Sequence, residues 1–555
     1  MSRDRTLAFA LILGLIGGIV SACGGDGAGR RDADRNILHL SIGADPASLD
    51  PIQAVDVNRG ELVAYMYDAL VQFTDDEVQP NLAESWEISE DGTVYTFRLR
   101  DDVYFHNGRK LTAEDVVYSF ERVLRPASAS PLTWVLDKIV GADAMADGEA
   151  EALEGIRAVD PRTVEITIGE PYAPFLKLMA MPAAHVVPKE EIESKGEAFS
   201  EAPVGTGPWI FESWAHDDVM RLSSNPRYHG GAPEMDGIEI RIIPETTTVI
   251  AEFERGNLDW VDMNEFPRPE FERFAGDPEW EGQIHDRPAL ITYYLALNNS
   301  EEKFADPRVR RALNLAIDVD QIAEVIYPGE VNLSHGPIPP GLPGYREDGE
   351  PYGFDADSAR ALLSAAGADD LTFDVYFRTL ALNQRFLEAV QANLADVGVT
   401  MNLQQRDWTA VRQSVNQGEL DAYLLNWFAD YPDAENFLYP LFYSEMAGAG
   451  GNAAFYRDAT VDSLILTART TLDDAERIAL YEEADRRIFE DAPWIFTVHP
   501  VDYDMVQPWV EGYEIPQVFY GNKWLGVSLT ASEEATAEEV TADRDEGTGR
   551  GENPA

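Results

Sequence analysis

The sequence predicts an α/β fold divided into several domains, and three observations carry this prediction. The chain has 555 residues, whereas a typical domain has about 150. Hydrophobic residues make up 45% of it, enough to fill more than one core. Residues 371–377 and 399–405 have the composition of strands, and 383–398 between them has a helical period. Strand, helix and strand in this order form the building unit of α/β folds.

The same periodicities predict further elements from the N-terminus onward. A short strand is expected after residue 36 and a helix at 60–73. The segment 91–108 reads as a strand, a turn and a second strand. Thr112, followed three residues later by Asp115, forms a capping box that starts another helix. The remaining expected strands are 162–168, 237–243 and 291–299, and the remaining expected helices are 306–318 and 355–367.

The first 22 residues read as a secretion signal rather than as part of the fold. Two arginines precede an apolar run at 7–20, which is too short to span a bilayer as a stable helix. Ser21 and Ala22 come directly before Cys23, a pattern that resembles the lipobox of bacterial lipoproteins. The resemblance implies that Cys23 is lipidated and becomes the mature N-terminus. The alternative is ordinary signal cleavage near Ala22, which leaves a free thiol on the only cysteine of the chain.

Both ends of the mature chain have the composition of flexible segments. Residues 23–35 are rich in Gly and Asp and are expected to form a tether. Residues 530–555 are acidic, contain almost no large apolar side chain and are expected to form a disordered tail. The net charge of −56 would repel phosphates and excludes nucleic acid as a partner.

No common catalytic or metal-binding motif occurs in the sequence. Its eight histidines are too far apart to form a metal pair, and it contains no HExxH, CxxC or GxSxG pattern. The stretch GTGPW at 205–209 is not a phosphate loop, because Pro208 lacks the backbone N–H that such a loop needs. We therefore predict no catalytic residue, no metal and no cofactor.

Residues 81–124 strongly resemble the signature of the solute-binding proteins of peptide-type ABC importers, the oligopeptide- and dipeptide-binding proteins. The segment reads NLAESWEISEDGTVYTFRLRDDVYFHNGRKLTAEDVVYSFERVL. Four other motifs lie in the order usual for that family: SLDP at 48–51, GTGPW at 205–209, DPRVRRAL at 306–313 and WFADYPDAENFL at 427–438.

The resemblance implies a two-lobed periplasmic-binding-protein clamshell of type II, which closes on its ligand by a hinge motion. It also implies an extra subdomain inserted in the first lobe. The expected segments are 36–79, 201–285 and 506–529 for the core of the first lobe, 80–200 for the inserted subdomain and 286–505 for the second lobe.

One segment, 426–442, combines six aromatic residues with three acids and contains no Lys, Arg or His. In the family, the Asp that follows this Trp by three residues holds the α-ammonium group of the peptide, which points to Asp430. A buried ammonium needs such a carboxylate. The resemblance implies contacts with the ligand backbone for Asn426 and Phe428, side-chain pockets lined by Trp427 and Trp408, and a facing loop of the first lobe that includes Val55, Asp56 and Val57.

Several of these positions have a purely structural alternative. Asp430 would then be a turn acid before a Tyr-Pro pair, and Trp427 and Trp408 would belong to the core. Asp433 and Glu435 are expected to be surface or helix-cap acids.

The chain also departs from the family's well-known tripeptide binders, which carry basic residues for the peptide carboxylate. Val415, Asn416 and Leu424 stand at the corresponding positions, and Arg412 nearby is the only substitute.

The resulting hypothesis is an extracytoplasmic, lipid-anchored, monomeric protein that captures oligopeptides between its lobes and delivers them to an ABC permease. It would touch the membrane only through the lipid. The same fold in relatives carries dipeptides, nickel chelates, haem or oligosaccharides, so another solute remains an alternative. A lipid-anchored hydrolase is the alternative from a different functional class.

Overall fold

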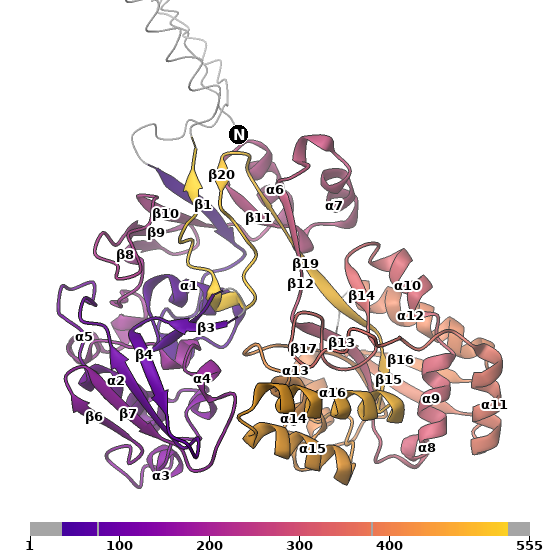
Figure 1. Cartoon of the computed structure of the whole chain (residues 1–555). Helices are drawn as coiled ribbons and strands as arrows, with labels where there is room; N and C mark the ends of the chain where they lie inside the picture. Colours follow the sequence, from indigo (N-terminus) through magenta and orange to yellow (C-terminus); the bar gives the residue numbers. More distant parts are fainter. Residues whose placement is uncertain (1–35, 75–76, 379–380, 531–555) are drawn as a thin grey trace, which may run out of the picture.

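The computed structural model describes residues 36–74, 77–378 and 381–530. They form two α/β lobes that lie side by side and are joined by long strands (Figure 1). The predicted two-lobed α/β architecture is thus confirmed. Among the described residues, no helix is both long and apolar enough to cross a membrane. The predicted signal, the lipidated Cys23, the tether and nearly all of the acidic tail lie outside the described residues.

The first lobe is built on a four-stranded sheet assembled from distant parts of the chain. Its strand order is β1 (Ile37–Ile42), β10 (Gly237–Ile242), β9 (Val219–Ser224) and β8 (Trp209–Ala215). The first two strands are parallel and the others antiparallel. Helix α1 (Val57–Met66) packs beside this sheet. The chain returns here at its end with the paired strands β20 (Val510–Glu511) and β21 (Ser528–Leu529).

The same lobe carries a second, antiparallel sheet with its own helices. The sheet order is β4 (Ala83–Ile88), β5 (Val94–Leu99), β7 (Thr163–Thr167) and β6 (Ile156–Asp160). The helices of this region are α2 (Ala113–Leu124), α3 (Ala142–Ala146), α4 (Phe175–Leu178) and α5 (Lys189–Lys195). The predicted capping box begins α2, where the Thr112 N–H donates to the Asp115 carboxylate at 2.9 Å.

The second lobe contains a five-stranded sheet covered by helices. Its order is β16 (Thr400–Arg406), β15 (Thr372–Arg378), β17 (Ala422–Phe428), β13 (Ile291–Leu297) and β18 (Trp494–Phe496). Strands β15 and β16 are parallel and are joined by α12 (Ala381–Asp396), as predicted. The other helices are α8 (Glu302–Ala305), α9 (Pro307–Leu315), α10 (Val319–Ile326), α11 (Ala356–Ala366), α13 (Trp408–Asn416), α14 (Glu435–Phe442), α15 (Ala459–Thr470) and α16 (Asp474–Asp491).

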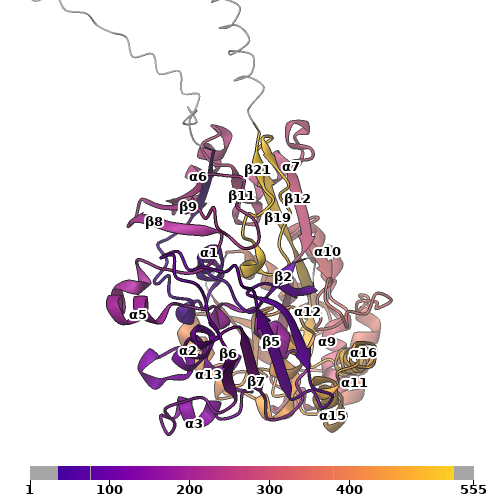
Figure 2. The ribbon, with the colours of Figure 1, turned by 60° about the vertical axis from the view of Figure 1, so that its left-hand side comes forward.

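Two strands carry the chain between the lobes. Strand β19 (Val498–Val506) pairs at its start with β14 (Val331–Leu333) and further on with β11 (Trp260–Asp262) and β12 (Ile284–Pro288). Strand β12 leads directly into β13 of the second lobe, so β12 and β19 run together across the junction (Figure 2). Helices α6 (Thr246–Glu254) and α7 (Arg268–Ala275) lie at one end of these junction strands. The residue boundaries predicted for the lobes stay a prediction.

Two local expectations from the sequence are wrong. The helix expected at 60–73 ends at Met66, and Val71–Thr74 forms strand β2, which pairs with β3 (Glu77–Pro80). The second strand expected before Gly108 is reduced to an isolated bridge between Tyr104 and Lys110. Apolar residues are frequent in 67–73, and a buried extended segment cannot be told from a helix by apolar content alone.

The GTGPW motif has a structural role at the end of α1. The Gly207 N–H donates to the Met66 carbonyl at 3.0 Å, and the Thr206 hydroxyl donates to Asp68 at 2.9 Å. A Cβ at Gly207 would lie 2.5 Å from the Tyr65 carbonyl oxygen, and one at Gly205 would overlap the Met66 carbonyl. Both positions therefore need glycine because two backbones meet there.

We predict that Gly205→Ala lowers the free energy of unfolding by about 1–3 kcal/mol, the usual cost of overpacking. Gly43→Ala is the matched control, since a Cβ there meets nothing within 4 Å. Chemical denaturation of both variants measures the difference. Equal stability of the two would contradict the close backbone approach.

Candidate functional site

Strand β17 has an open edge next to the junction of the lobes. Its pairing with β13 runs from Ala422 to Phe428, whereas its pairing with β15 stops at Tyr423. From Leu424 onward, the side of β17 that faces away from β13 therefore has no strand partner in the described sheets. A free edge of this kind can bind an extended peptide as an added strand.

Asp430 follows this strand and is held by its own neighbours. Its backbone N–H donates to the Asn436 side-chain oxygen at 2.9 Å, and the Asn436 amide donates to the Asp430 carboxylate at 3.2 Å. The Tyr520 hydroxyl donates to the Asp430 carbonyl at 3.1 Å. Within the described ranges, no cation pairs with the Asp430 carboxylate. Burial raises the pKa of Asp430, and the hydrogen bond from Asn436 opposes this only in part.

Three of the other predicted contact residues present apolar side chains to solvent. Val55 is 50% exposed, Val57 42% and Phe428 48%. The side chain of Asp56, by contrast, has partners: it accepts the Arg59 N–H at 2.9 Å as the N-cap of α1 and forms an ion pair with the Arg59 guanidinium. Asp56 is thus primarily a helix cap.

The remaining predicted residues lie around β17. Asn426 is half-buried and faces Tyr293 on β13, whereas Trp427 packs against the core and points its indole N–H toward Asn436 at 3.4 Å. Trp408 begins α13, and its side chain is outside the described part of the structure. Of the residues at the positions usual for basic groups, Val415 and Leu424 are buried and Asn416 is exposed. Arg412 is exposed on α13.

The prediction that Asp433 and Glu435 lie on the surface is wrong. Each is only 2% exposed, and cations from distant segments compensate their charges. Asp433 pairs with Lys177 at 2.7 Å and with Arg477 at 2.5 Å, and Glu435 pairs with Arg469 at 2.7 Å. Asp433 accepts the Glu435 N–H at 2.9 Å just before α14, but the N-cap residue of this helix is Ala434. Because these cations are remote in sequence, the local segment could not reveal them.

Lys177 belongs to the first lobe, so its ion pair with Asp433 joins the two lobes. Lys177 also donates to the Pro432 carbonyl at 2.6 Å. The hydroxyls of Tyr172 and Tyr431 lie 3.3 Å apart across the same contact. Burial alone would raise the pKa of Asp433, but the charges of Lys177 and Arg477 outweigh it and hold the pKa at about 2.

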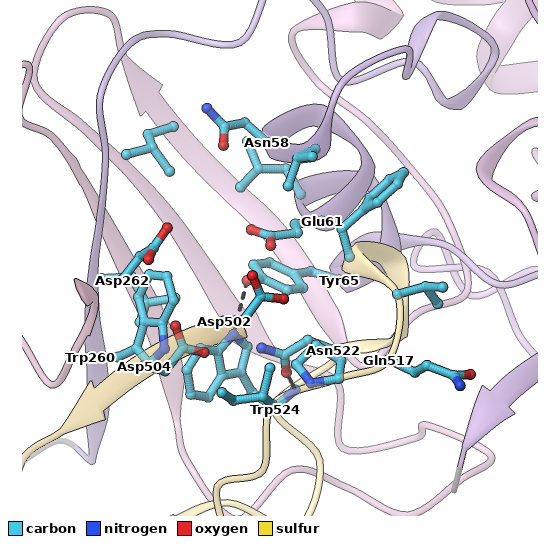
Figure 3. Close-up of a pocket in the computed structure, with 18 of the residues that line it drawn as sticks. Asn58, Glu61, Tyr65, Trp260, Asp262, Asp502, Asp504, Gln517, Asn522 and Trp524 are labelled. Carbon is cyan, nitrogen blue, oxygen red and sulfur yellow. Dashed lines mark hydrogen bonds between the residues drawn. The ribbon is translucent and has the colours of Figure 1, made fainter. Parts of the chain in front are cut away.

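A cavity of about 430 Å³ opens beside Phe428 and Ala429, between α1, the junction strands and the C-terminal segment (Figure 3). This volume is within the range of pockets that hold small ligands. Val57, Phe428 and Ala429 line it, and aromatic walls come from Tyr65, Trp260, Tyr513, Phe519 and Trp524. Two of the residues that line the cavity therefore immediately precede Asp430 in the sequence.

Sequence reasoning missed the acidic side chains of this cavity, Glu61, Asp262, Glu265, Asp502 and Asp504. The one local signal was the spacing of Asp502 and Asp504, since residues two apart on a strand face the same side. In the part of the chain that the structure describes, no group of three or more His, Cys, Asp or Glu residues could hold a metal ion.

The two lobes, the crossing strands and a cleft between them define a type II periplasmic solute-binding protein. The chain belongs to the bacterial extracellular solute-binding proteins, family 5, whose family model matches residues 77–448. It is 31% identical over 507 residues to di/tripeptide-binding protein 2 of Pseudomonas aeruginosa (strain UCBPP-PA14), a match that covers 87% of this chain and 93% of the relative.

Two further comparisons show the range of this family. The chain is 31% identical over 488 residues to heme-binding protein A of Haemophilus influenzae (strain ATCC 51907 / DSM 11121 / KW20 / Rd), which covers 84% of this chain and 87% of that protein. Its fold matches the periplasmic binding protein DppA from Helicobacter pylori in complex with the peptide STSA, with a TM-score of 0.73 and 30% identity. That match covers 90% of this chain and 99% of the solved one.

We predict that Lys177→Met lowers the free energy of unfolding by about 1.5–3 kcal/mol near neutral pH, because it removes charged hydrogen bonds to a buried carboxylate. Asp433 titrates in the folded state at a pKa of about 2, below the 3.9 of an unfolded Asp. The pair therefore contributes stability above about pH 4 that is lost as the pH falls toward 2.

Urea unfolding at pH 7 and at pH 2.5 measures both effects. Lys189→Met is the matched control, because Lys189 lies in the same lobe, is 56% exposed and is 3.6 Å from its acidic partner. A Lys177→Met variant as stable as this control at pH 7 would rule out a stabilising role for the contact between the lobes.

Proposed function

We propose that this protein captures oligopeptides in the cleft between its lobes and delivers them to the permease of an ABC importer. The observation that carries the proposal is the carboxylate of the half-buried Asp430, which no described cation neutralises and which follows the open edge of β17. Its relatives with peptide-binding names and the solved complex with STSA support the same substrate class.

Each part of a peptide finds a matching chemical group in the cleft. The α-ammonium group pairs with Asp430, because an ammonium removed from water needs a carboxylate. The peptide backbone pairs with the edge of β17 at Leu424–Phe428 as an added strand. This pairing uses main-chain groups only and therefore does not depend on the peptide sequence. Side chains enter the cavity beside Phe428, whose aromatic walls supply contact area without strict shape demands. The exposed Val55 and Val57 then cover the ligand from the first lobe.

Among the described residues, none at the positions usual for basic groups offers a cation to the C-terminus of the peptide, and Arg412 is exposed nearby on α13. Val415 and Leu424, at positions where tripeptide binders carry basic residues, are buried apolar side chains. A binding protein without a fixed partner for the peptide carboxylate has no reason to select one length. We therefore propose that peptides of several lengths are accepted.

The protein acts outside the cytoplasm, as expected for a family of extracellular solute-binding proteins. Lipidation of Cys23 would hold it at the membrane next to its permease, and the sequence VSAC after an apolar run supports this. We propose a binding protein and not a hydrolase. Haem is the second candidate ligand, since heme-binding protein A is as similar as the peptide-binding relative.

We predict that Asp430→Asn weakens the binding of free peptides on the order of 30- to several-thousand-fold. Removing one partner of a buried charge pair typically costs about 2–5 kcal/mol. N-acetylated peptides have no ammonium group and should lose much less affinity. Calorimetric titration of both proteins with both peptide forms gives a double-mutant cycle.

Asp369→Asn is the control, since Asp369 is an exposed acid elsewhere in the second lobe. The affinity of the wild-type protein for free peptides should also fall on acidification, starting above the pH at which exposed Asp residues titrate, because burial raises the pKa of Asp430. Zero coupling between the Asp430 carboxylate and the peptide ammonium would refute the anchor. Binding of haem but of no peptide would refute the proposed substrate.

We predict that Cys23→Ser moves the protein from the membrane fraction to the soluble fraction after a salt wash. Fractionation of cells that make either form, followed by immunoblotting, measures the distribution. A serine variant that still sediments with membranes would show that the thiol carries no anchor.

A further inference from the structure

Four of the five acidic side chains that line the cavity beside Phe428 come from three elements (Figure 3). Glu61 lies on α1, Asp262 ends β11, and Asp502 and Asp504 lie on β19. The last two are two residues apart and therefore face the same side of the sheet.

Strand pairing places two of these acids directly opposite each other. Asp262 on β11 faces Asp504 on β19. Like charges at directly opposite positions of paired strands destabilise a sheet. Burial and the charge of Asp504 raise the pKa of Asp262 to about 8, and burial together with the charge of Asp502 raises the pKa of Asp504 to about 7. The arrangement therefore costs folding energy when the cavity contains only water.

The basic groups nearest to this cluster are engaged elsewhere. None of the residues that line the cavity, all of them within the described ranges, is Lys, Arg or His. Arg287 pairs with Asp502 in the strand register and donates to the Ile515 carbonyl at 3.2 Å. Burial raises the pKa of Asp502 to about 6, and the charge of Arg287 opposes this only in part. His285 faces Asp504, packs edge-on against Tyr513 and is held mainly neutral by burial, which lowers its pKa.

Glu61 provides an independent indication of a missing partner. The carboxyl group of Glu61 belongs to a half-buried side chain that lines the cavity. No hydrogen bond to it is formed by any described residue. Burial, and then the charges of Asp504 and Asp262, raise the pKa of Glu61 to about 8. The other acids have partial partners: Asp262 accepts the Asn264 N–H at 2.8 Å, and Asp504 accepts the Tyr513 hydroxyl.

We infer that this cavity is a subsite for a basic side chain, Lys or Arg, of the bound peptide. This inference rests on the proposed function and gives it a preferred substrate class. A metal ion is a poor occupant, because the described acids are not arranged as a metal-binding group. A side-chain ammonium or guanidinium can instead donate to several separated carboxylates at once.

The walls and the position of the cavity fit such a side chain. Tyr65, Trp260 and Trp524 offer aromatic surface for the aliphatic stem and for a cation–π contact. Phe428 and Ala429 line the cavity and immediately precede Asp430. A peptide held at its ammonium group by Asp430 therefore passes the mouth of the cavity with one of its first residues.

Calorimetric titration with matched tripeptides tests the inference. Ala-Lys-Ala and Ala-norleucine-Ala have similar aliphatic side chains at the second position, but only the Lys side chain ends in an ammonium group. Ala-Glu-Ala carries a negative charge at this position. The Lys is also moved to the first and the third position. At the favoured position, Lys should bind tighter than norleucine on the order of tenfold or more, and the Glu peptide should bind weakest.

Two variants locate the origin of this preference. Glu61→Gln and Asp262→Asn should each remove most of the advantage of Lys over norleucine, measured as the ratio of the two affinities within each variant. Asp286→Asn is the matched control: Asp286 is exposed and adjoins Arg287 on β12, so its side chain points to the other face of the sheet. The Asp286→Asn variant tests whether the net negative charge of the protein alone accounts for the preference for Lys.

The outcomes separate the two proposals. Equal binding of the Lys and norleucine peptides would overturn the basic subsite and leave peptide capture standing. An equal loss of preference in Asp286→Asn would also overturn it, since the effect would then be long-range. Binding of none of the tripeptides, nor of longer peptides, would overturn the proposed function itself.

Discussion

The charge of Asp430 is the constraint on which the rest of the site depends. A carboxylate removed from water is unfavourable unless a cation or several hydrogen bonds compensate it. Asn436 supplies only one side-chain hydrogen bond to this carboxylate, and burial still raises its pKa. A ligand that brings an ammonium group removes this deficit. On the proposed function, the ligand supplies the cation that the described residues do not provide to Asp430.

The neighbouring acids show that this deficit is specific to one position. Asp433 and Glu435 are more deeply buried, yet each has an arginine partner, and Asp433 has Lys177 in addition. These compensated acids fix the start of α14 and connect the second lobe to the first. Asn436, the next residue, orients the uncompensated one. The segment 430–436 therefore contains two acids with cationic partners and one acid, Asp430, with which no described cation pairs.

Much of the fold could be predicted from the sequence because its signals are local. The capping box of α2 and the strand, helix and strand of 371–405 depend on spacing within a few residues. Motif resemblance pointed to Asp430 and Phe428 as ligand contacts, and this assignment stays a prediction. The compensated state of Asp433 could not be predicted, because its partner Lys177 lies more than 250 residues away. The acids of the cavity escaped notice for the same reason, since strand pairing alone brings Asp262 opposite Asp504.

A crystal structure of the protein with a peptide that has a free N-terminus tests the central claim most directly. The α-amino nitrogen should lie within hydrogen-bond distance of the Asp430 carboxylate, about 2.7–3.2 Å. The peptide backbone should pair with the edge of β17 between Leu424 and Phe428. A complex with the amino group bound elsewhere, for example at Asp56, and with that edge unpaired, would contradict the assignment of the site.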